Sequence, residues 1–192
     1  MKSLHFSKKE WSFLVIAGFM LLIAFIFDNQ ILNFIIENRI STLNIFMIPL
    51  SYIGSLIAVS IITTILFILY KKYSNLKKLW ITLFSIVIIT YVLKFVIHRA
   101  RPLVETLIQT SGYSFPSGHA TAVFSVLPLL DKEFPRLKYV WIIFAFLVLF
   151  SRVYLGVHYP SDVIAGAILG YLTGNLIIYI QDRNLTIYGK YE

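Results

Sequence analysis

The chain has 192 residues, of which 58% are hydrophobic and only 14% are charged, and its formal net charge is +8. A soluble domain contains about 25% charged residues, and the apolar residues here form long runs, so the composition excludes an ordinary soluble protein and predicts an integral membrane protein. Because cysteine is absent, the sequence also excludes a disulfide framework, a thiolate nucleophile and a cysteine-bound metal.

The first apolar run covers residues 11–27 and follows two lysines. A signal peptide would have a shorter apolar core and a cleavage site built from small residues. This run ends instead in the polar sequence Asp28-Asn29-Gln30. We therefore predict that it is retained as the first membrane span.

Six runs are long enough to cross a bilayer of about 30 Å, which takes roughly 17–25 helical residues. They cover residues 11–27, 49–70, 79–97, 117–130, 139–155 and 161–180. The fourth run is short and polar at its start. The sequence therefore predicts a single all-α domain, a polytopic bundle of six transmembrane helices with both termini on one side of the membrane.

The intervening segment of residues 29–48 is too polar to span but carries an apolar stripe. Two interpretations are open for it. It forms a helix that lies in the outer membrane interface, or it is an ordinary loop packed on the bundle.

The basic residues indicate the orientation, because cytoplasmic segments of membrane proteins are enriched in lysine and arginine. With both termini in the cytoplasm, 12 of the 17 basic residues lie on inner segments: Lys2, Lys8, Lys9, Lys71, Lys72, Lys77, Lys78, Lys132, Arg136, Lys138, Arg183 and Lys190. The outer side keeps Arg39, Lys94, Arg99, Arg101 and Arg152. The basic surplus is then a topology signal, and no basic stripe with interleaved aromatic residues is left to indicate nucleic-acid binding.

Ionisable residues gather at the outer ends of three predicted spans. Lys94 and Arg101 are seven residues apart, so both face the same way if the helix persists to Arg101 and ends at Pro102. Arg152 adds a third cation, and Asp162 is the one nearby acid. Long basic side chains also reach the interface without any function, but convergence of three cations favours an anion site, for which the arginine fork suits phosphate oxygens.

The sequence Pro116-Ser117-Gly118-His119 begins the fourth run. Proline followed by small residues is typical of a helix start, where free backbone N–H groups attract an anion. Ser117 offers a hydroxyl donor, and Gly118 lets the backbone approach a ligand closely. A plain helix entry is the alternative, but His119 places a proton donor beside the anion and favours a functional site.

His158 lies just before the sixth run, Pro160 starts it, and Asp162 follows four residues after His158. This spacing lets the carboxylate bind one imidazole nitrogen and fix the tautomer. The other nitrogen is then available for nucleophilic attack. A structural hydrogen bond is the alternative, and the neighbouring cations and second histidine make it the less favoured one.

Three glycines, Gly166, Gly170 and Gly174, follow Asp162 at four-residue intervals on one helix face. Small residues at this spacing let membrane helices pack closely. Packing inside the bundle is favoured over dimerisation.

At these residues the sequence resembles the type 2 phosphatidic acid phosphatase family, which shares its site with the vanadium haloperoxidases. The family pattern has three parts, K-x6-RP, PSGH and SR-x5-H-x3-D. They stand here as Lys94…Arg101-Pro102, Pro116-Ser117-Gly118-His119 and Ser151-Arg152…His158…Asp162. No position departs from the pattern, and the motifs cover residues 94–162.

The resemblance implies a role for each matching residue. The residue at His158 attacks phosphorus and forms a phosphohistidine, Asp162 orients it, and His119 protonates the leaving alcohol and then activates water. The phosphate oxygens are held by Lys94, Arg101, Ser117, Gly118 and Arg152. No metal or other cofactor is implied, because the cations take the place of a metal. His98, Arg99 and Glu105 lie outside the motifs, and we interpret them as rim residues.

The predicted activity is hydrolysis of a lipid phosphate or pyrophosphate at the outer membrane face. Undecaprenyl pyrophosphate and phosphatidylglycerophosphate are the leading substrates, and phosphatidic acid follows. The partners are thus the substrate lipid and the bilayer, with no nucleic acid, and the oligomeric state is not predicted. The alternative is a non-catalytic lipid-binding or transport protein on the same fold, which would have lost the nucleophile or the acid.

Overall fold

The structure, a computed structural model, describes residues 8–188 of the chain. Two of the basic residues predicted to lie inside, Lys2 and Lys190, fall outside that range. The described residues form α-helices and one short 3-10 helix, η1 (Tyr73–Asn75), and contain no strand. The α-helices are α1 (Lys8–Glu37), α2 (Ser41–Ile53), α3 (Leu56–Leu69), α4 (Leu76–Ile97), α5 (Gly118–Ser125), α6 (Leu127–Glu133), α7 (Leu137–Tyr154) and α8 (Pro160–Tyr188). The predicted all-α fold is confirmed.

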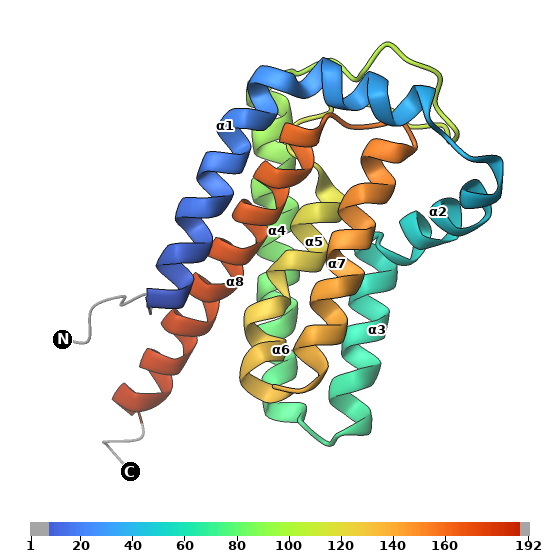
Figure 1. The fold of residues 1–192 in the computed structure, drawn as a ribbon. Helices are drawn as coiled ribbons and strands as arrows, with labels where there is room; N and C mark the ends of the chain where they lie inside the picture. The colour runs from blue at the N-terminus through green and yellow to red at the C-terminus, as the bar shows by residue number, and fades with distance from the viewer. Residues whose placement is uncertain (1–7, 189–192) are drawn as a thin grey trace.

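The short helix α5 lies at the centre of the bundle, surrounded by α3, α4, α7 and α8 (Figure 1). Its side chains from Ala120 to Ser125 are all buried. The outer helices carry many exposed apolar side chains instead, such as Val15, Phe84 and Val140. An apolar exterior around a packed centre is the arrangement expected of a bundle surrounded by lipid.

Four described helical segments are long and apolar enough to cross a membrane: Leu14–Glu37, Tyr73–Ile97, Leu137–Tyr154 and Pro160–Arg183. A fifth crossing results if the bent pair α2 and α3 counts as one span. The described residues thus define a multi-pass membrane protein with four or five candidate spans, and the sixth crossing stays a prediction.

The run predicted at residues 49–70 is not one straight helix. It breaks at Gly54, where α2 meets α3 at a bend of 68°. The side chain of Ser55 starts α3 by accepting a hydrogen bond from the Ala58 N–H at 3.3 Å. A Cβ added at Gly54 would lie 2.5 Å from a methyl carbon of Val148 on α7, so the glycine allows the bend to pack against α7.

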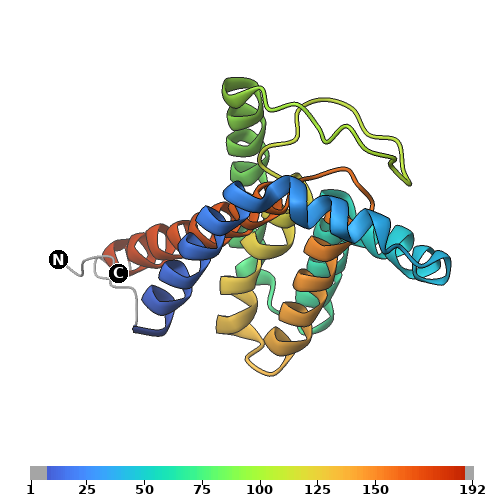
Figure 2. The ribbon, with the colours of Figure 1, turned by 45° about the horizontal axis from the view of Figure 1, so that its top comes forward.

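The polar segment of residues 29–48 is helical but is divided between two elements. Helix α1 kinks at Phe27 (φ −110°, ψ 16°) and continues to Glu37, and α2 begins at Ser41. The second half of α1 crosses over one end of the bundle (Figure 2). Leu32 on that half is 1% exposed, so this segment packs on the bundle and covers that end.

The run predicted at residues 117–130 consists of two short helices, α5 and α6, of 8 and 7 residues. Pro128 lies at the start of α6, and its missing N–H interrupts the helical hydrogen-bond ladder. Neither piece alone is long enough to cross a bilayer. Placed end to end, they extend from the centre of the bundle toward one end (Figure 1).

The three glycines of α8 pack against α5, as predicted for packing inside the bundle. A Cβ added at Gly166 would lie 2.6 Å from the carbonyl oxygen of Ser117, just before α5, and one added at Gly170 or Gly174 would lie 2.3 or 2.2 Å from a carbonyl oxygen of α5. Side chains of any size would separate the two helices, so the glycines set the distance between α5 and α8.

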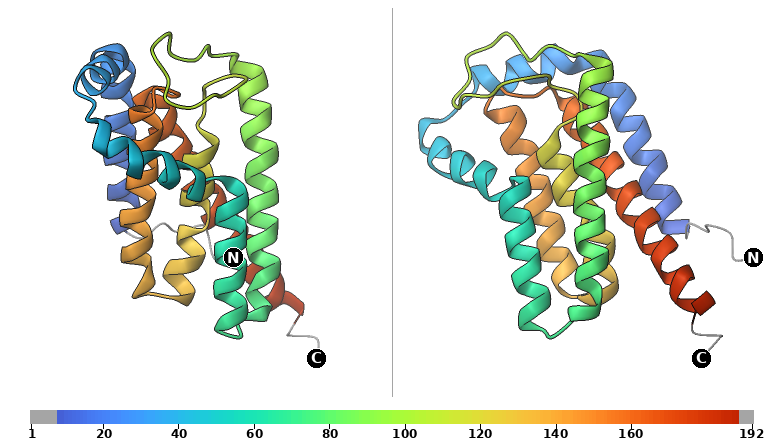
Figure 3. Two further views of the ribbon diagram at one scale, coloured as in Figure 1. Left: turned by 90° about the vertical axis from the view of Figure 1, so that its right-hand side faces the viewer. Right: turned by 180° about the vertical axis from the view of Figure 1, so that it is seen from behind.

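The bundle has two distinct ends. The start of α1 and the end of α8 lie at one of them, and the long segment of residues 98–117 covers the other (Figures 1 and 3). Ion pairs near the first end join neighbouring elements, with Lys72 bound to Glu133 at 2.8 Å and Lys78 bound to Asp182 at 2.6 Å.

Candidate active site

Helix α4 ends at Ile97, where the predicted run 79–97 ends, and does not persist to Arg101. His98 adopts a left-handed conformation (φ 50°, ψ 30°), which ends the helix at Ile97. The expected helical face shared by Lys94 and Arg101 therefore does not exist, and Pro102 is not the residue that ends the helix. Arg101 reaches the site from the following loop instead.

A cavity of about 510 Å³ opens between α3, α4, α5, α7 and the segment of residues 98–117. Six of the eight predicted site residues line it: Lys94, Arg101, Gly118, His119, Arg152 and His158. The other two, Ser117 and Asp162, are fully buried next to lining residues. The lining also includes apolar and aromatic side chains of α3 and α4, namely Leu56, Ile86, Val87, Tyr91 and Phe95. The structure thus gathers residues from four separate segments of the chain around one space.

Two of the three predicted phosphate-binding cations are held in place by backbone carbonyls. Lys94 Nζ donates to the carbonyl oxygen of Tyr113 at 2.6 Å. Arg101 donates from Nη1 to the carbonyl oxygen of Val157 at 2.7 Å and from Nε to that of Gly112 at 3.0 Å. These contacts fix both side chains at the cavity wall without neutralising their charge, because carbonyls are dipoles and not anions.

Arg152 is the most buried of the three cations, with 3% of its surface exposed. Its Nη1 donates to the hydroxyl of Ser51 on α2. Its Nε has no hydrogen-bond partner within the described part of the chain. A buried donor of this kind is costly to leave unpaired, so it favours an acceptor that enters the cavity.

Ser117 precedes α5 in an extended conformation and is fully buried. Its N–H donates to the carbonyl oxygen of Asp162 at 3.0 Å, so this amide is not available to a ligand as the sequence led us to expect. Its hydroxyl oxygen finds no partner among the described residues. The hydroxyl is the group that Ser117 can offer to an anion.

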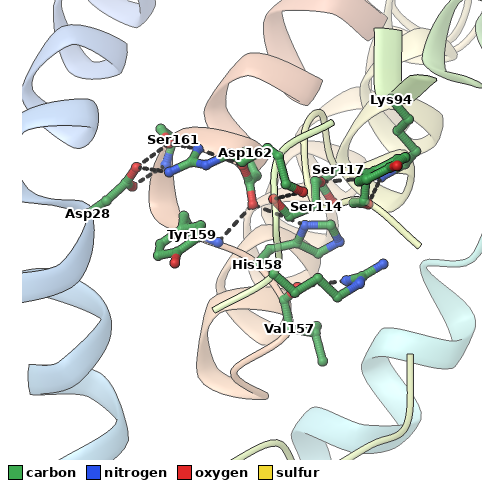
Figure 4. Close-up of polar contacts among 12 residues, drawn as sticks. Asp28, Lys94, Ser114, Ser117, Val157, His158, Tyr159, Ser161 and Asp162 are labelled. Carbon is green, nitrogen blue, oxygen red and sulfur yellow. Dashed lines mark hydrogen bonds and ion pairs between the residues drawn. The ribbon is translucent and has the colours of Figure 1, made fainter. Parts of the chain in front are cut away.

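The predicted pairing of His158 with Asp162 is present (Figure 4). His158 Nδ1 lies 3.3 Å from Asp162 Oδ2, and the same oxygen accepts the Tyr159 N–H at 2.9 Å. The side chains of both paired residues are buried, with exposed fractions of 3% and 0%. The carboxylate therefore binds the imidazole nitrogen that points away from the cavity, and it fixes the tautomer and the ring plane.

The pKa of His158 lies well below the ordinary value for histidine, first because the ring is buried and second because the cations of the cavity repel an added proton. A backbone hydrogen bond with Ser114 offsets part of this effect. His158 is therefore neutral at neutral pH, which is the form a nucleophile needs.

The prediction that Arg99 is a rim residue is wrong. Its Nη1 donates to Asp162 Oδ1 at 2.7 Å and its Nη2 to Asp28 Oδ2 at 2.6 Å, so the side chain points toward the buried acids beside His158. Asp28 is 5% exposed and is a second acid near the site, so Asp162 is not alone there. The sequence did contain a signal for this role, because Arg99 follows the apolar run 79–97 closely. A charge near membrane depth is costly unless it has a partner.

The remaining rim residues lie where the sequence placed them. His98 and Glu105 are exposed, and the His98 ring lies 4.5 Å from that of Tyr113. Among the described residues, no group of three or more histidine, cysteine or acidic side chains could hold a metal ion.

Fold and site together define an integral membrane protein with an oriented histidine in a cation-lined cavity. The chain belongs to the PAP2 superfamily, whose sequence model matches residues 75–186. The resemblance found in the motifs is thereby confirmed.

Three relatives show how far this similarity extends. The chain is 37% identical to an undecaprenyl-diphosphatase of Sulfolobus acidocaldarius, over 81% of this chain and 79% of that protein. It is 46% identical to phosphatidylglycerophosphatase B of Bacillus subtilis, over 42% of this chain and 45% of that protein. The crystal structure of a transmembrane PAP2-type phosphatidylglycerolphosphate phosphatase from Bacillus subtilis is similar with a TM-score of 0.73 and 27% identity, and the match covers 88% of this chain and 96% of that one.

Proposed function

We propose that this protein is a membrane lipid phosphatase in which His158 attacks the phosphorus atom of a lipid phosphate or diphosphate. The observation that carries the proposal is the neutral His158, oriented by the buried Asp162, at the wall of a cavity lined by three cations. Two of the relatives described above are an undecaprenyl-diphosphatase and a phosphatidylglycerophosphatase by name, which supports the same class of reaction.

The reaction has two half-reactions. In the first, Nε2 of His158 forms a bond to phosphorus while the bond between phosphorus and the lipid oxygen breaks, and His119 donates a proton to that oxygen. In the second, a water molecule attacks the phosphohistidine and gives a proton to His119. The bond between phosphorus and nitrogen then breaks, and inorganic phosphate leaves.

The phosphate oxygens bind Lys94, Arg101 and Arg152, with further donors from the Ser117 hydroxyl and the Gly118 amide. These groups stabilise the charge that develops on the equatorial oxygens in the transition state. Since three fixed cations supply the positive charge, we propose that turnover needs no metal ion.

The lipid part of the substrate contacts the apolar wall of the cavity, formed by residues such as Leu56 and Ile86. Undecaprenyl diphosphate and phosphatidylglycerophosphate are the leading substrates, in line with the names of the relatives, and phosphatidic acid comes next. In a diphosphate substrate, the leaving group is the lipid monophosphate.

We further propose six crossings with both termini in the cytoplasm and the cavity at the outer face. The helices α5 and α6 together make the fourth crossing, and α2 with α3 makes the second. The excess of basic residues on the predicted inner segments supports this orientation. The location of the cavity segment, residues 98–117, at the end of the bundle opposite the start of α1 is consistent with it.

Phosphate release from a panel of these lipids, measured in EDTA, tests the proposal. We expect turnover to survive the chelator and to be abolished in His158→Ala. A phosphohistidine trapped by rapid acid-free quenching, and located at His158 by mass spectrometry, would be direct support. Equal turnover by His158→Ala would disprove the mechanism.

The alternative of a non-catalytic lipid-binding or transport protein is not favoured. Such a protein has no need for a nucleophile, an orienting acid and a proton donor in one cavity. His158, Asp162 and His119 are all present at this site.

A further inference from the structure

Arg99 joins two buried carboxylates that come from opposite ends of the chain. One of its terminal nitrogens donates to Asp162 on α8 at 2.7 Å and the other to Asp28 on α1 at 2.6 Å. Figure 4 shows Asp28 reaching from α1 toward Ser161 and Asp162, with His158 beyond them. A continuous chain of charged contacts therefore leads from the kink of α1 to the nucleophile.

The two oxygens of Asp162 have separate partners. Oδ2 lies toward His158 and accepts the Tyr159 N–H, while Oδ1 accepts from Arg99. Contacts on both oxygens fix the rotation of the carboxylate, and the adjacent guanidinium stabilises its charged form. A carboxylate that is 0% exposed would otherwise be costly to keep ionised.

Asp28 holds Arg99 in this position. Its Oδ2 accepts from Arg99, and its Oδ1 accepts the Ser161 N–H at 2.8 Å, which also places a negative charge at the start of α8. The guanidinium is covered by the Tyr159 ring, with 4.2 Å between the guanidinium carbon and the ring centroid. Arg99 is thus fixed on three sides by groups that do not themselves reach the cavity.

We propose that Arg99 and Asp28 are positioning residues for phosphoryl transfer: they hold Asp162 ionised and rotated so that His158 presents Nε2 to phosphorus. This inference rests on the proposed function, in which His158 is the nucleophile. Asp28 lies outside the residues matched by the family, 75–186, so the N-terminal helix contributes to the chemistry.

The test compares Asp28→Asn, Arg99→Gln and the double variant in detergent-solubilised, folded protein. The substrate is phosphatidylglycerophosphate or undecaprenyl diphosphate, whichever the parent protein hydrolyses faster. We expect kcat to fall by roughly 10–100-fold in each single variant, by analogy with the loss found when a group that orients a metal-binding histidine or carboxylate through a hydrogen bond is removed. KM and the inhibition constant for inorganic phosphate should stay within about threefold, because the three cavity cations are unchanged.

Two further comparisons distinguish positioning from mere stabilisation. Since Asp28 acts through Arg99, the double variant should be no slower than Arg99→Gln alone. Arg99→Lys keeps the charge and should recover part of kcat. Asp131→Asn, which removes an exposed ion pair with Lys138, is the control and should keep full activity.

The proposal is overturned if kcat per folded molecule stays at the parent level while only the melting temperature falls. It is equally overturned if phosphate inhibition weakens in proportion to kcat, because the cavity itself would then be disturbed. If Arg99→Gln does not fold, Asp28→Asn carries the test, since it keeps the shape of the side chain. Failure of the proposed function is a different result, namely turnover that persists in His158→Ala.

Discussion

Asp162 links the histidine to the rest of the protein. One of its oxygens faces His158 and the other accepts from Arg99, so a single buried carboxylate couples the nucleophile to an ion pair with α1. The histidine gains orientation and a fixed tautomer from this contact, while burial and the cations of the cavity keep it neutral. The site therefore combines a neutral histidine, the proposed nucleophile, with three cations in the wall of the same cavity.

Substitution of His119 is expected to affect the two proposed half-reactions differently. In His119→Ala, we expect turnover of a lipid phosphate to fall by about 10²–10⁴-fold, the usual contribution of general acid–base catalysis. An aryl phosphate, whose leaving oxygen needs no proton, should still phosphorylate His158. Because the base for the second step is missing, phosphohistidine should accumulate and be detectable by mass spectrometry. Absence of this accumulation, with both steps slowed alike, would contradict the assigned role.

The lowered pKa of His158 predicts a dependence of stability on pH. In the unfolded chain a histidine binds a proton below about pH 6.5, whereas in the folded protein His158 stays neutral to a lower pH. The contribution of His158 to the free energy of unfolding is therefore complete above the ordinary histidine pKa. It is lost as the pH falls from there toward the lower pKa that His158 has in the folded protein. Between pH 7 and pH 5, the melting temperature in detergent should fall less in His158→Gln than in the parent. An equal fall in both proteins would show that this histidine is not the group responsible.

The contact between α5 and α8 sets the positions of the two histidines for which we propose catalytic roles. Helix α5 carries His119 in its first turn, and α8 begins two residues after His158 and carries Asp162. The glycine face of α8 lets the backbones approach, and the Ser117 N–H bonds to the Asp162 carbonyl at 3.0 Å. The start of α5, with His119, and the start of α8, with Asp162, are thereby fixed relative to one another.

Gly170→Ala tests this packing. The added Cβ would lie 2.3 Å from the carbonyl oxygen of Thr121, an atom of the backbone that cannot turn away. We expect a destabilisation of about 1–3 kcal/mol, the usual cost of overpacking, measured as reversible unfolding in mixed micelles, with a loss of activity. Gly18→Ala is the matched control, since a Cβ there meets no described atom within 4 Å. Equal stability of the two variants would rule out the packing role.

The two ends of the bundle differ in their charged residues and in the chain segments that lie over them. Near the start of α1 and the end of α8, lysines on several elements pair with acids such as Glu133 and Asp182. At the opposite end, the second half of α1 crosses over the bundle (Figure 2), and the segment of residues 98–117 contributes to the cavity wall. This asymmetry matches a protein that presents its reactive site at one membrane face and its anchoring charges at the other.

Single cysteines test the orientation, because the native chain has none. Ser74→Cys lies in η1, between α3 and α4, and Ser111→Cys lies in the segment beside the cavity. In intact cells, an impermeant maleimide should label the cysteine at 111 and leave that at 74 unlabelled. After lysis both should react. Labelling at 74 but not at 111 in intact cells would reverse the proposed topology.

The sequence by itself determined the all-helical membrane fold, the family and most of the residues that the structure gathers around the cavity. Long apolar runs require helices in lipid, because every backbone polar group must be paired there, and local spacing placed Asp162 within reach of His158. The gathering of six predicted residues around one cavity also agrees with the sequence, since their spans end on one side.

Only the tertiary structure decided the features that depend on contacts between distant segments. The bend at Gly54 depends on Val148, 94 residues further along the chain, and Arg101 reaches the cavity from a loop and not from α4. Asp28 and Arg99 meet across 71 residues of sequence. No local pattern of hydrophobicity or spacing records such a pairing, because the two charges come together only after the helices have packed, and each needs the other once it is removed from water.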